Sequence, residues 1–407
     1  MADASHWEPR YASRAARMKA SEIRELLKLL DQPDIISFAG GIPDPALFPT
    51  EAARAAYADC LSTPELAGQA LQYSTSEGYL PLREWIVGYM GKLGVPCQPD
   101  NILITSGSQQ ALEFLGKLLL SPGDTVLVPA PTYLGALQAF SAYEPQYDRL
   151  RPEDGNRTAA AYAETAAATG QVKMAYVVPD FDNPSGNTMS LGARERMLDL
   201  ATELDIPIIE DAAYAALRFS GEPMPCLQAL EIARGGSIDT CRVIYCGTFS
   251  KTIAPGLRVG WICATQSLIR RLVLIKQASD LHSSSLNQIV MHRLVTETFD
   301  DQVAKARAKY SRRRDAMLAA LERHMPPGVT WTKPEGGLFV WVTLPEAMDG
   351  AELLQRAVEK ERVAFVPGGA FFADGSGANT LRLSFSLADE AKIEEGIKRL
   401  GRLIRSS

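Results

Sequence analysis

Residues 247–260 read GTFSKTIAPGLRVG and follow the apolar run 242–246, which is typical of a buried strand. Lys251 therefore comes just past the end of a predicted strand, among hydroxyl groups and glycines. Burial beside another positive charge lowers the pKa of a lysine and makes the amine nucleophilic. The alternative, a surface lysine in a flexible loop, is disfavoured by the apolar residues on both sides. The side chains that would hold a phosphate next to Lys251 are Thr248, Ser250 and Arg258.

Short apolar runs alternate with longer amphipathic stretches on the N-terminal side of this segment. The runs cover residues 101–105, 125–128, 173–178 and 206–209. Nearly continuous apolar strands separated by helices predict an α/β fold with a mainly parallel sheet, covered on both faces, from about residue 70 to 265.

The C-terminal part of the chain has a different pattern. A long helical region is predicted from roughly 266 to 325, and strand signals return at 336–342, 362–366 and 380–385. Their alternation of apolar and polar residues predicts a smaller α+β domain with one solvated sheet face.

Composition restricts the classes of function. The chain has 407 residues and a formal net charge of −6, which argues against nucleic acid as the main partner. No apolar run reaches the ~18 residues of a membrane helix, and the N-terminus lacks a secretory pattern. The six cysteines form no CxxC pair and the four histidines are scattered, so we expect a cytoplasmic protein with reduced thiols and no metal site.

Three further segments place polar groups at strand ends. Ser108 begins a predicted helix after Gly107, where free backbone N–H groups favour an anion, although ordinary helix capping explains it equally well. Asn183 follows a strand within a turn sequence, and turn chemistry is the alternative there. Asp211 ends another strand and needs a buried cation to face, unless it only caps a helix; Tyr214 could reach the same ligand.

Together these segments describe a ligand with a phosphate, a protonated ring nitrogen and a carbonyl that traps an amine. Pyridoxal phosphate has these three features, and a Schiff-base lysine with an acidic partner for the pyridinium nitrogen is the expected signature of its site.

Five motifs carry a resemblance to a known family. They are SEIRELL (21–27), SFAGGIPDPALFP (37–49), LQYSTSEGYLPLR (71–83), NPSGNT with EDAAY (183–188 and 210–214), and GTFSKTIAPGLRVGW (247–261). In this order they resemble the fold-type I, aspartate-aminotransferase-like enzymes, and most closely the subgroup containing 2-aminoadipate and kynurenine aminotransferases. The resemblance covers about residues 20 to 404.

The resemblance implies a fold-type I architecture. We expect a large domain at 51–300, with a mainly parallel seven-stranded sheet between helices, and a small α+β domain at 301–407. Residues 1–50 are expected to form an N-terminal arm and a mobile helix that contribute to the small domain and the substrate site.

The resemblance also implies roles for single residues. Lys251 would form an aldimine with the cofactor and shuttle the substrate proton. Asp211 would keep the pyridine nitrogen protonated, Asn183 and Tyr214 would bind the ring oxygen, and Tyr133 would stack on the ring. The residues assigned to the phosphate are Ser108, Gln109, Thr248, Ser250, Arg258 and, from the neighbouring subunit of a homodimer, Tyr73.

The substrate residues implied by the resemblance are Arg382, Arg24, Asn183 and Gly40. Arg382 would bind the α-carboxylate bidentately; without the resemblance, an exposed strand charge and an inward or edge role are equally plausible. Arg24 matches the position where relatives that use acidic substrates bind a side-chain carboxylate, and its alternative is a solvated helix charge. Gly40 would line the substrate entrance.

The expected function is that of a dimeric transaminase with ping-pong chemistry. 2-Oxoglutarate is the expected acceptor, and the donor is 2-aminoadipate, another dicarboxylic acid, or a bulky apolar or aromatic amino acid. A β-lyase on the same cofactor is the closest alternative. An effector-sensing regulator is disfavoured by the acidic charge and by the first motif starting at residue 21, which leaves no room before it for a DNA-binding domain.

Overall fold

A seven-stranded sheet forms the centre of the computed structural model, which describes residues 6–17 and 34–406. Its strand order is β2-β8-β7-β6-β5-β3-β4. Strand β8 runs in the opposite direction to the other six strands of this sheet, so the prediction of a mainly parallel sheet is confirmed. The strands are β2 (Ile102–Thr105), β3 (Thr125–Pro129), β4 (Gln146–Leu150), β5 (Val172–Val177), β6 (Ile208–Asp211), β7 (Val243–Thr248) and β8 (Gly260–Cys263).

Helices cover both faces of this sheet, because its central strands are apolar on both sides. In β3, Val126 and Val128 pack with α5 (Ser108–Leu119), α6 (Leu134–Ser141) and α10 (Gln266–Ser279). Leu127, between them, packs on the opposite face. The helices of that face are α7 (Ala159–Ala166), α8 (Leu191–Leu204) and α9 (Leu227–Ala233). Because helices bury both faces of the sheet, a ligand can reach it at the edge formed by the carboxyl ends of β5, β6 and β7.

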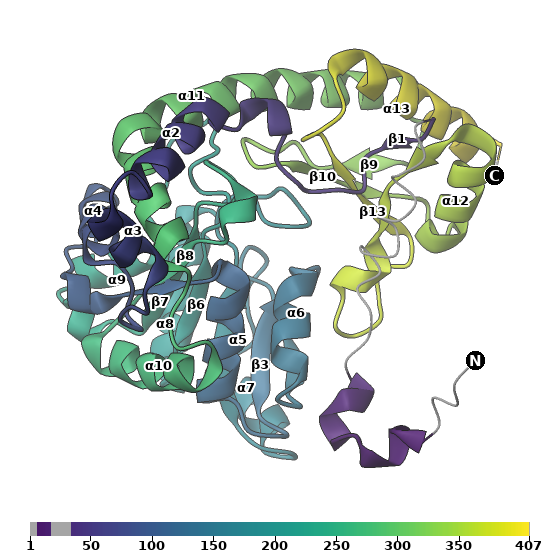
Figure 1. Ribbon diagram of the computed structural model, residues 1–407. Helices are drawn as coiled ribbons and strands as arrows, with labels where there is room; N and C mark the ends of the chain where they lie inside the picture. Colours follow the sequence, from purple (N-terminus) through teal and green to yellow (C-terminus); the bar gives the residue numbers. More distant parts are fainter. Residues whose placement is uncertain (1–5, 18–33, 407) are drawn as a thin grey trace.

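A smaller antiparallel sheet lies apart from the first (Figure 1). Its order is β12 (Val366–Pro367), β13 (Thr380–Ser384), β10 (Phe339–Thr343) and β9 (Thr330–Trp331). Helices α12 (Gly350–Arg356) and α13 (Glu390–Arg405) accompany it, and β1 (Ile36–Ser37) pairs with β11 (Val363–Ala364) beside it. The expected smaller α+β unit is therefore present, but the predicted solvated sheet face is wrong: all of β13 and the first four residues of β10 are buried, because residues such as Ala39 and Phe371 pack on the face that carries Trp341.

Helix α11 (Ser285–His324) connects the two sheets and crosses the predicted boundary at residue 300 (Figure 1). Met291 and Leu294 near its start pack with α4 (Leu80–Lys92), whereas Met317 and Leu321 belong to the cluster that includes α13. One continuous helix therefore belongs to both parts, and the division at 50 and 300 stays a prediction.

The predicted helical region 266–325 is divided into α10 and α11. Leu281 has a left-handed φ of 62°, and the Ser284 hydroxyl accepts a hydrogen bond from Asn287 N at the start of α11. A left-handed residue and a serine cap end one helix and begin the next. Helices α2 (Thr50–Cys60) and α3 (Pro64–Leu71) precede the sheet and pack near the first half of α11.

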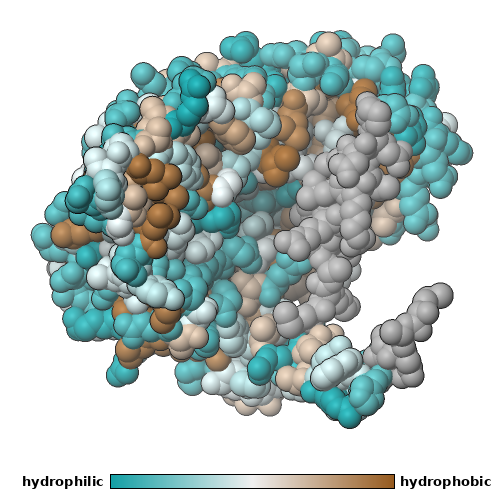
Figure 2. Space-filling model, viewed as in Figure 1, coloured by the Kyte–Doolittle hydropathy of each residue, from teal (hydrophilic) through white to brown (hydrophobic). Residues whose placement is uncertain are grey.

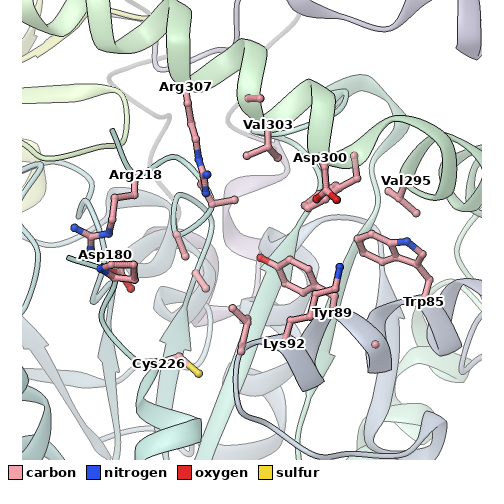
Figure 3. A pocket seen from close by; sticks show the side chains of 18 of the residues that line it. Trp85, Tyr89, Lys92, Asp180, Arg218, Cys226, Val295, Asp300, Val303 and Arg307 are labelled. Atoms are coloured by element: carbon pink, nitrogen blue, oxygen red, sulfur yellow. Dashed lines mark hydrogen bonds and ion pairs between the residues drawn. The ribbon is translucent and has the colours of Figure 1, made fainter. Parts of the chain in front are cut away.

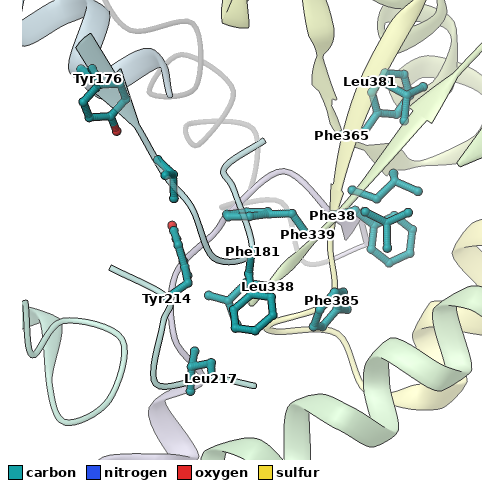
Figure 4. Packing of buried hydrophobic residues seen from close by; sticks show 14 of the residues in the cluster. Phe38, Tyr176, Phe181, Tyr214, Leu217, Leu338, Phe339, Phe365, Leu381 and Phe385 are labelled. Atoms are coloured by element: carbon teal, nitrogen blue, oxygen red, sulfur yellow. The ribbon is translucent and has the colours of Figure 1, made fainter. Parts of the chain in front are cut away.

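A buried apolar cluster joins the two sheets (Figure 4). Tyr214 and Phe181 come from segments that follow strands of the large sheet, and Phe339 comes from β10 of the small one. The rings of Tyr214 and Phe339 meet edge to face, with centroids 5.6 Å apart. This contact joins the segment after β6 of the large sheet to β10 of the small sheet.

Among the described helices, none has the length and apolar character needed to cross a bilayer. Within residues 6–17 and 34–406, no group of three His, Cys, Asp or Glu side chains is arranged to hold a metal ion.

Candidate active site

Lys251 lies in the turn after β7, at the carboxyl edge of the large sheet. Its Nζ donates a hydrogen bond to Gly41 O at 3.0 Å. Burial and the positive charges of Arg382 and Arg258 together lower the pKa of Lys251 to about 8, and the carboxylate of Asp211 opposes this shift. The amine is therefore close to losing its proton near neutral pH, as a nucleophilic lysine requires.

An anion cradle lies beside Lys251, where α5 begins. Gly107 has φ +82°, and a Cβ atom there would lie 2.3 Å from Arg258 Nη2. Arg258 itself adopts φ 55° and donates to Ser106 O at 3.1 Å and towards Ser250 Oγ at 3.5 Å. Glycine thus allows the guanidinium to lie against the first backbone N–H groups of α5, which favour an anion.

Neighbouring strands bring the rest of this cradle together. Gly260 on β8 pairs with Thr105 on one side and Thr248 on the other, so both loops meet at this point. The Thr248 hydroxyl donates to Ser250 Oγ at 2.9 Å. The cradle therefore contains four potential hydrogen-bond donors for an anion: the start of α5 at Ser108, the hydroxyl groups of Thr248 and Ser250, and the guanidinium of Arg258.

Asp211 ends β6 with a buried carboxylate that is 3% exposed. Tyr176 Oη donates to its Oδ2 at 2.9 Å, whereas Oδ1 is buried without a hydrogen-bond partner. Burial raises the pKa of Asp211 to about 6. An unpartnered buried carboxylate oxygen calls for a donor, and a protonated ring nitrogen supplies one.

Glu210, the preceding residue, has a separate role that was missed from the sequence. Its two oxygens accept hydrogen bonds from Leu227 N at 2.9 Å and Gln228 N at 3.0 Å, and so cap α9. Successive strand residues face opposite sides, and this alternation was the signal that separates the two acids.

Asn183, Tyr214 and Arg382 form a connected group. Asn183 Nδ2 lies 3.5 Å from Tyr214 Oη, and its Oδ1 accepts from Arg382 Nη1 at 2.7 Å. Asn183 therefore joins the predicted ring-oxygen partner to the predicted carboxylate partner.

Arg382 is buried between two aromatic rings, not exposed on its strand. Its guanidinium carbon lies 4.3 Å from the Phe339 ring centroid and 5.1 Å from that of Phe371. The side chain is 2% exposed and its Nε has no partner. Burial lowers the pKa of Arg382 to about 10. The two rings hold the plane of the guanidinium group, and its N–H groups can still donate hydrogen bonds to an anion.

Residues 39–41 bring three backbone carbonyls to this site. Ala39 O accepts from Arg382 Nη2 at 2.8 Å, Gly40 O from Ser386 Oγ at 3.2 Å, and Gly41 O from Lys251. A Cβ on Gly41 would lie 2.4 Å from Phe339 Cζ, so glycine is required for this approach. The paired glycines of the motif at 37–49 were the sequence signal for this turn.

Tyr133 and Gln109 lie together next to α5. Tyr133 Oη is 3.5 Å from Gln109 Oε1, and Gln109 Nε2 donates to Gly135 O at 2.7 Å. Burial raises the pKa of Tyr133 to about 12, so the phenol stays neutral. The pair presents a flat, uncharged ring, as stacking on a cofactor requires.

Two predicted residues are not part of the contacts described so far. Tyr73 is 78% exposed and packs edge to face on His282 at 5.8 Å, so its predicted role depends on a second subunit. Arg24 lies outside the described residues.

A separate cavity of about 1150 Å³ lies between α4, α11 and the segment after β6 (Figure 3). Trp85 and Tyr89 line one side and Arg218 the other, with Arg218 paired to Asp180 at 3.1 Å. Lys251, Arg258 and Arg382 do not line it. The cavity is therefore distinct from the site around Lys251.

The donor set fits pyridoxal phosphate. Asp211 offers a buried acceptor for the ring nitrogen, Tyr133 a flat ring, Lys251 an amine of lowered pKa, and the α5 start an anion cradle with Arg258. The fold and the site thus define the class of pyridoxal-phosphate enzymes.

Comparison with known proteins identifies the family. Residues 33–400 match the model of aminotransferase class I and II. Aromatic-amino-acid aminotransferase 1 of Thermococcus litoralis is 44% identical over 405 residues, which cover 98% of this chain and 95% of that protein. The chain belongs to the class I and II aminotransferases, and its cofactor is pyridoxal phosphate.

Two solved structures are similar over 98% of both chains. One is the alpha-aminoadipate aminotransferase LysN of Thermus thermophilus, complexed with N-(5'-phosphopyridoxyl)-L-leucine, with 41% identity and a TM-score of 0.88. The other is the kynurenine aminotransferase of Pyrococcus horikoshii, with 45% identity and a TM-score of 0.89. The predicted fold type and family are confirmed.

Proposed function

We propose that this aminotransferase moves the amino group of an L-amino acid to 2-oxoglutarate by ping-pong chemistry. The donor is a 2-aminoadipate-like or other dicarboxylic acid, or a bulky apolar or aromatic amino acid. The observation that carries this proposal is the buried guanidinium of Arg382, held by Asn183 and two aromatic rings in the same site as Lys251. The names of the similar aminotransferases support the range of donors.

Each residue of the site has a proposed task. When bound, pyridoxal phosphate stabilises negative charge at the α-carbon of the substrate. Arg382 binds the α-carboxylate and orients the substrate, and Lys251 Nζ takes the proton from Cα and returns it. Asp211 holds the proton on the ring nitrogen through Oδ1.

The remaining residues hold the cofactor. Tyr214 and Asn183 donate to the ring oxygen, and Tyr133 stacks on the ring. The residues proposed for the phosphate are Ser108, Gln109, Thr248, Ser250, Arg258 and, from a second subunit, Tyr73.

The test is a panel of amino donors with 2-oxoglutarate as acceptor. We expect turnover with dicarboxylic or aromatic donors, and parallel lines in double-reciprocal plots, because the first product leaves before the acceptor binds. Release of pyruvate and ammonia from a cysteine conjugate without any acceptor would instead indicate a β-lyase.

Arg24→Gln tests the proposed side-chain carboxylate partner. We expect about a tenfold rise in KM for dicarboxylic donors and little change for apolar ones, because one charge-assisted contact contributes on the order of 1.5 kcal/mol. Equal losses for both classes of donor would contradict this role. Gly40 is proposed to line the entrance beside it.

We also propose that the enzyme is a homodimer. Large apolar side chains around α2, α3 and the loop before α11 are exposed, and Figure 2 shows hydrophobic residues gathered on this face. Leu71 is 70% exposed and lies two residues from Tyr73. Exposed apolar patches of this kind favour a protein–protein contact. The members of this apolar patch are Leu61, Leu66, Leu71, Tyr73, Leu80 and Leu281.

We place the enzyme in the cytoplasm, with small molecules as its ligands and neither nucleic acid nor membrane as a partner. The net charge of −6 and the six free cysteines support this location.

A further inference from the structure

Lys276, near the end of α10, is a buried cation that the proposed chemistry does not use. Its side chain is fully buried. Nζ donates to Asp280 Oδ1 at 3.0 Å, Ser283 Oγ at 2.9 Å and Gln110 Oε1 at 3.1 Å. Burial lowers the pKa of Lys276 and Asp280 opposes this shift. A buried ammonium is costly unless its partners satisfy all of its donors, as they do here.

Two of these partners lead directly to Ser106, at the start of the anion cradle. Ser283 Oγ lies 3.2 Å from Ser106 Oγ, and Ser106 N donates to Gln110 Oε1 at 2.8 Å. Gln110 Nε2 in turn donates to Asp280 Oδ2 at 2.8 Å. Both the backbone and the side chain of Ser106 are thus attached to the Lys276–Asp280 ion pair.

The ammonium group of Lys276 only donates, so Ser283 Oγ and Gln110 Oε1 both accept from it. In the contact between Ser283 and Ser106, either hydroxyl group can be the donor. The carbonyl of Ser106 accepts from Arg258 Nη2 at 3.1 Å. Ser106 is therefore held on one side by Lys276 and its partners and on the other by the proposed phosphate-binding arginine.

We propose that Lys276 is a positioning residue for the phosphate-binding loop 106–108. Through Ser283 and Gln110 it holds Ser106, and so aims the first backbone N–H groups of α5 at the phosphate of the cofactor. This inference rests on the proposed placement of the phosphate beside Arg258 and Ser250. Lys276 itself does not contact the cofactor.

The test compares the affinity of cofactor-depleted enzyme for pyridoxal phosphate with that for pyridoxal, followed by absorbance. Both ligands carry the same aldehyde and ring, so the ratio of their dissociation constants isolates the phosphate. For Lys276→Met we expect pyridoxal phosphate to bind about tenfold more weakly, with less than about a twofold change for pyridoxal. Equal weakening of both ligands, or no weakening, would overturn the proposal.

Two serine variants separate positioning from general stability. Ser283→Ala removes the link to Ser106 but keeps the Lys276–Asp280 ion pair, and it should show a smaller phosphate-selective loss of about threefold. Ser141→Ala is the matched control, because that hydroxyl donates to Gln138 O at 3.1 Å at the C-terminal end of α6 and, in the described part of the chain, forms no hydrogen bond with residues 106–108. It should change neither constant, and identical behaviour of the two serine variants would contradict the proposal.

Arg258→Met tests the placement of the phosphate independently. A phosphate-selective loss in Arg258→Met without one in Lys276→Met and Ser283→Ala would reject the positioning role alone. No phosphate-selective loss in Arg258→Met would reject the placement itself, and the positioning role with it.

Discussion

At the scale of single residues, the chemistry of Lys251 is set by its burial and its charged neighbours. Burial and two arginines lower the pKa of its amine, and Asp211 only partly opposes them. The lowered pKa is a property of the folded site, because the same lysine in an unfolded chain has a pKa near 10.4. Cofactor capture should therefore depend on pH in a range set by this environment.

We expect the rate at which cofactor-depleted enzyme captures pyridoxal phosphate to rise with pH up to about 8 and then level off. Below this pH the amine is protonated, and its neutral fraction falls about tenfold per pH unit. Stopped-flow absorbance measures the rate. Arg382→Met should move the midpoint to higher pH, since it removes a positive charge that lowers the pKa of Lys251. A midpoint near 10 in the parent enzyme would contradict this account.

Several site residues could be predicted from the sequence because each stands at the end of an apolar strand. Asp211 ends β6, Lys251 and Asn183 come after β7 and β5, and parallel strands bring their carboxyl ends together. The carbonyls of residues 39–41 could not be predicted in this way, because backbone groups leave little trace in the sequence. The need for glycine at position 41 is seen only in the folded structure, where the Phe339 ring packs against it.

At the scale of elements, the junction between β6 and α9 depends on Glu210. This carboxylate is 1% exposed and accepts the first two backbone N–H groups of α9. Burial raises its pKa to about 7. The sequence predicted a role for Asp211 alone, and the strand geometry directs Glu210 to the helix instead of the cofactor site.

Glu210→Ala should lower the free energy of unfolding by about 2–4 kcal/mol, because two buried N–H groups lose their acceptors. Urea unfolding of the cofactor-depleted protein measures the change. Glu335→Ala is the control: its ion pair with Arg218 is 2.9 Å long but Glu335 is half exposed, so the loss should stay below about 1 kcal/mol. Equal losses for the two variants would contradict the capping role.

The apolar runs located β2, β3, β5, β6 and β7 closely, but they did not locate β4 and β8 or the interruption of the helical region around residue 280. Apolar periodicity continues from α10 into α11, and only the left-handed Leu281 and the Ser284 cap separate them. The segment between the two helices contains Asp280 and Ser283, and both side chains accept hydrogen bonds from Lys276 Nζ. The break between α10 and α11 therefore supplies two of the partners of Lys276.

At the scale of the whole molecule, α11 joins the two sheets and the active site lies between them. Lys251 and Asp211 come from the large sheet, and Arg382 from the small one. A relative movement of the two sheets would therefore separate the cofactor residues from the proposed carboxylate partner. The sequence predicted both sheets and a helical region over 266–325, but not that one helix belongs to both parts, because helical periodicity carries no information about a domain boundary.

The apolar patch around Leu71 and Tyr73 predicts the oligomeric state. Leu71→Glu should convert a dimer into monomers in analytical ultracentrifugation and reduce activity, because a charge at the centre of an apolar contact is strongly unfavourable. Leu191→Glu is the matched control, since Leu191 is 42% exposed at the start of α8, outside this patch. Retention of the dimer by Leu71→Glu, or a monomeric parent enzyme, would contradict the proposed interface.

The identity of the lysine that holds the cofactor is the central claim, and one measurement tests it most directly. Purified enzyme loaded with pyridoxal phosphate is reduced with borohydride, digested and mapped by mass spectrometry. We predict a single phosphopyridoxyl group on the peptide that contains Lys251, and none on the same peptide from Lys251→Ala. A group mapped to another lysine, such as Lys276, would contradict the account.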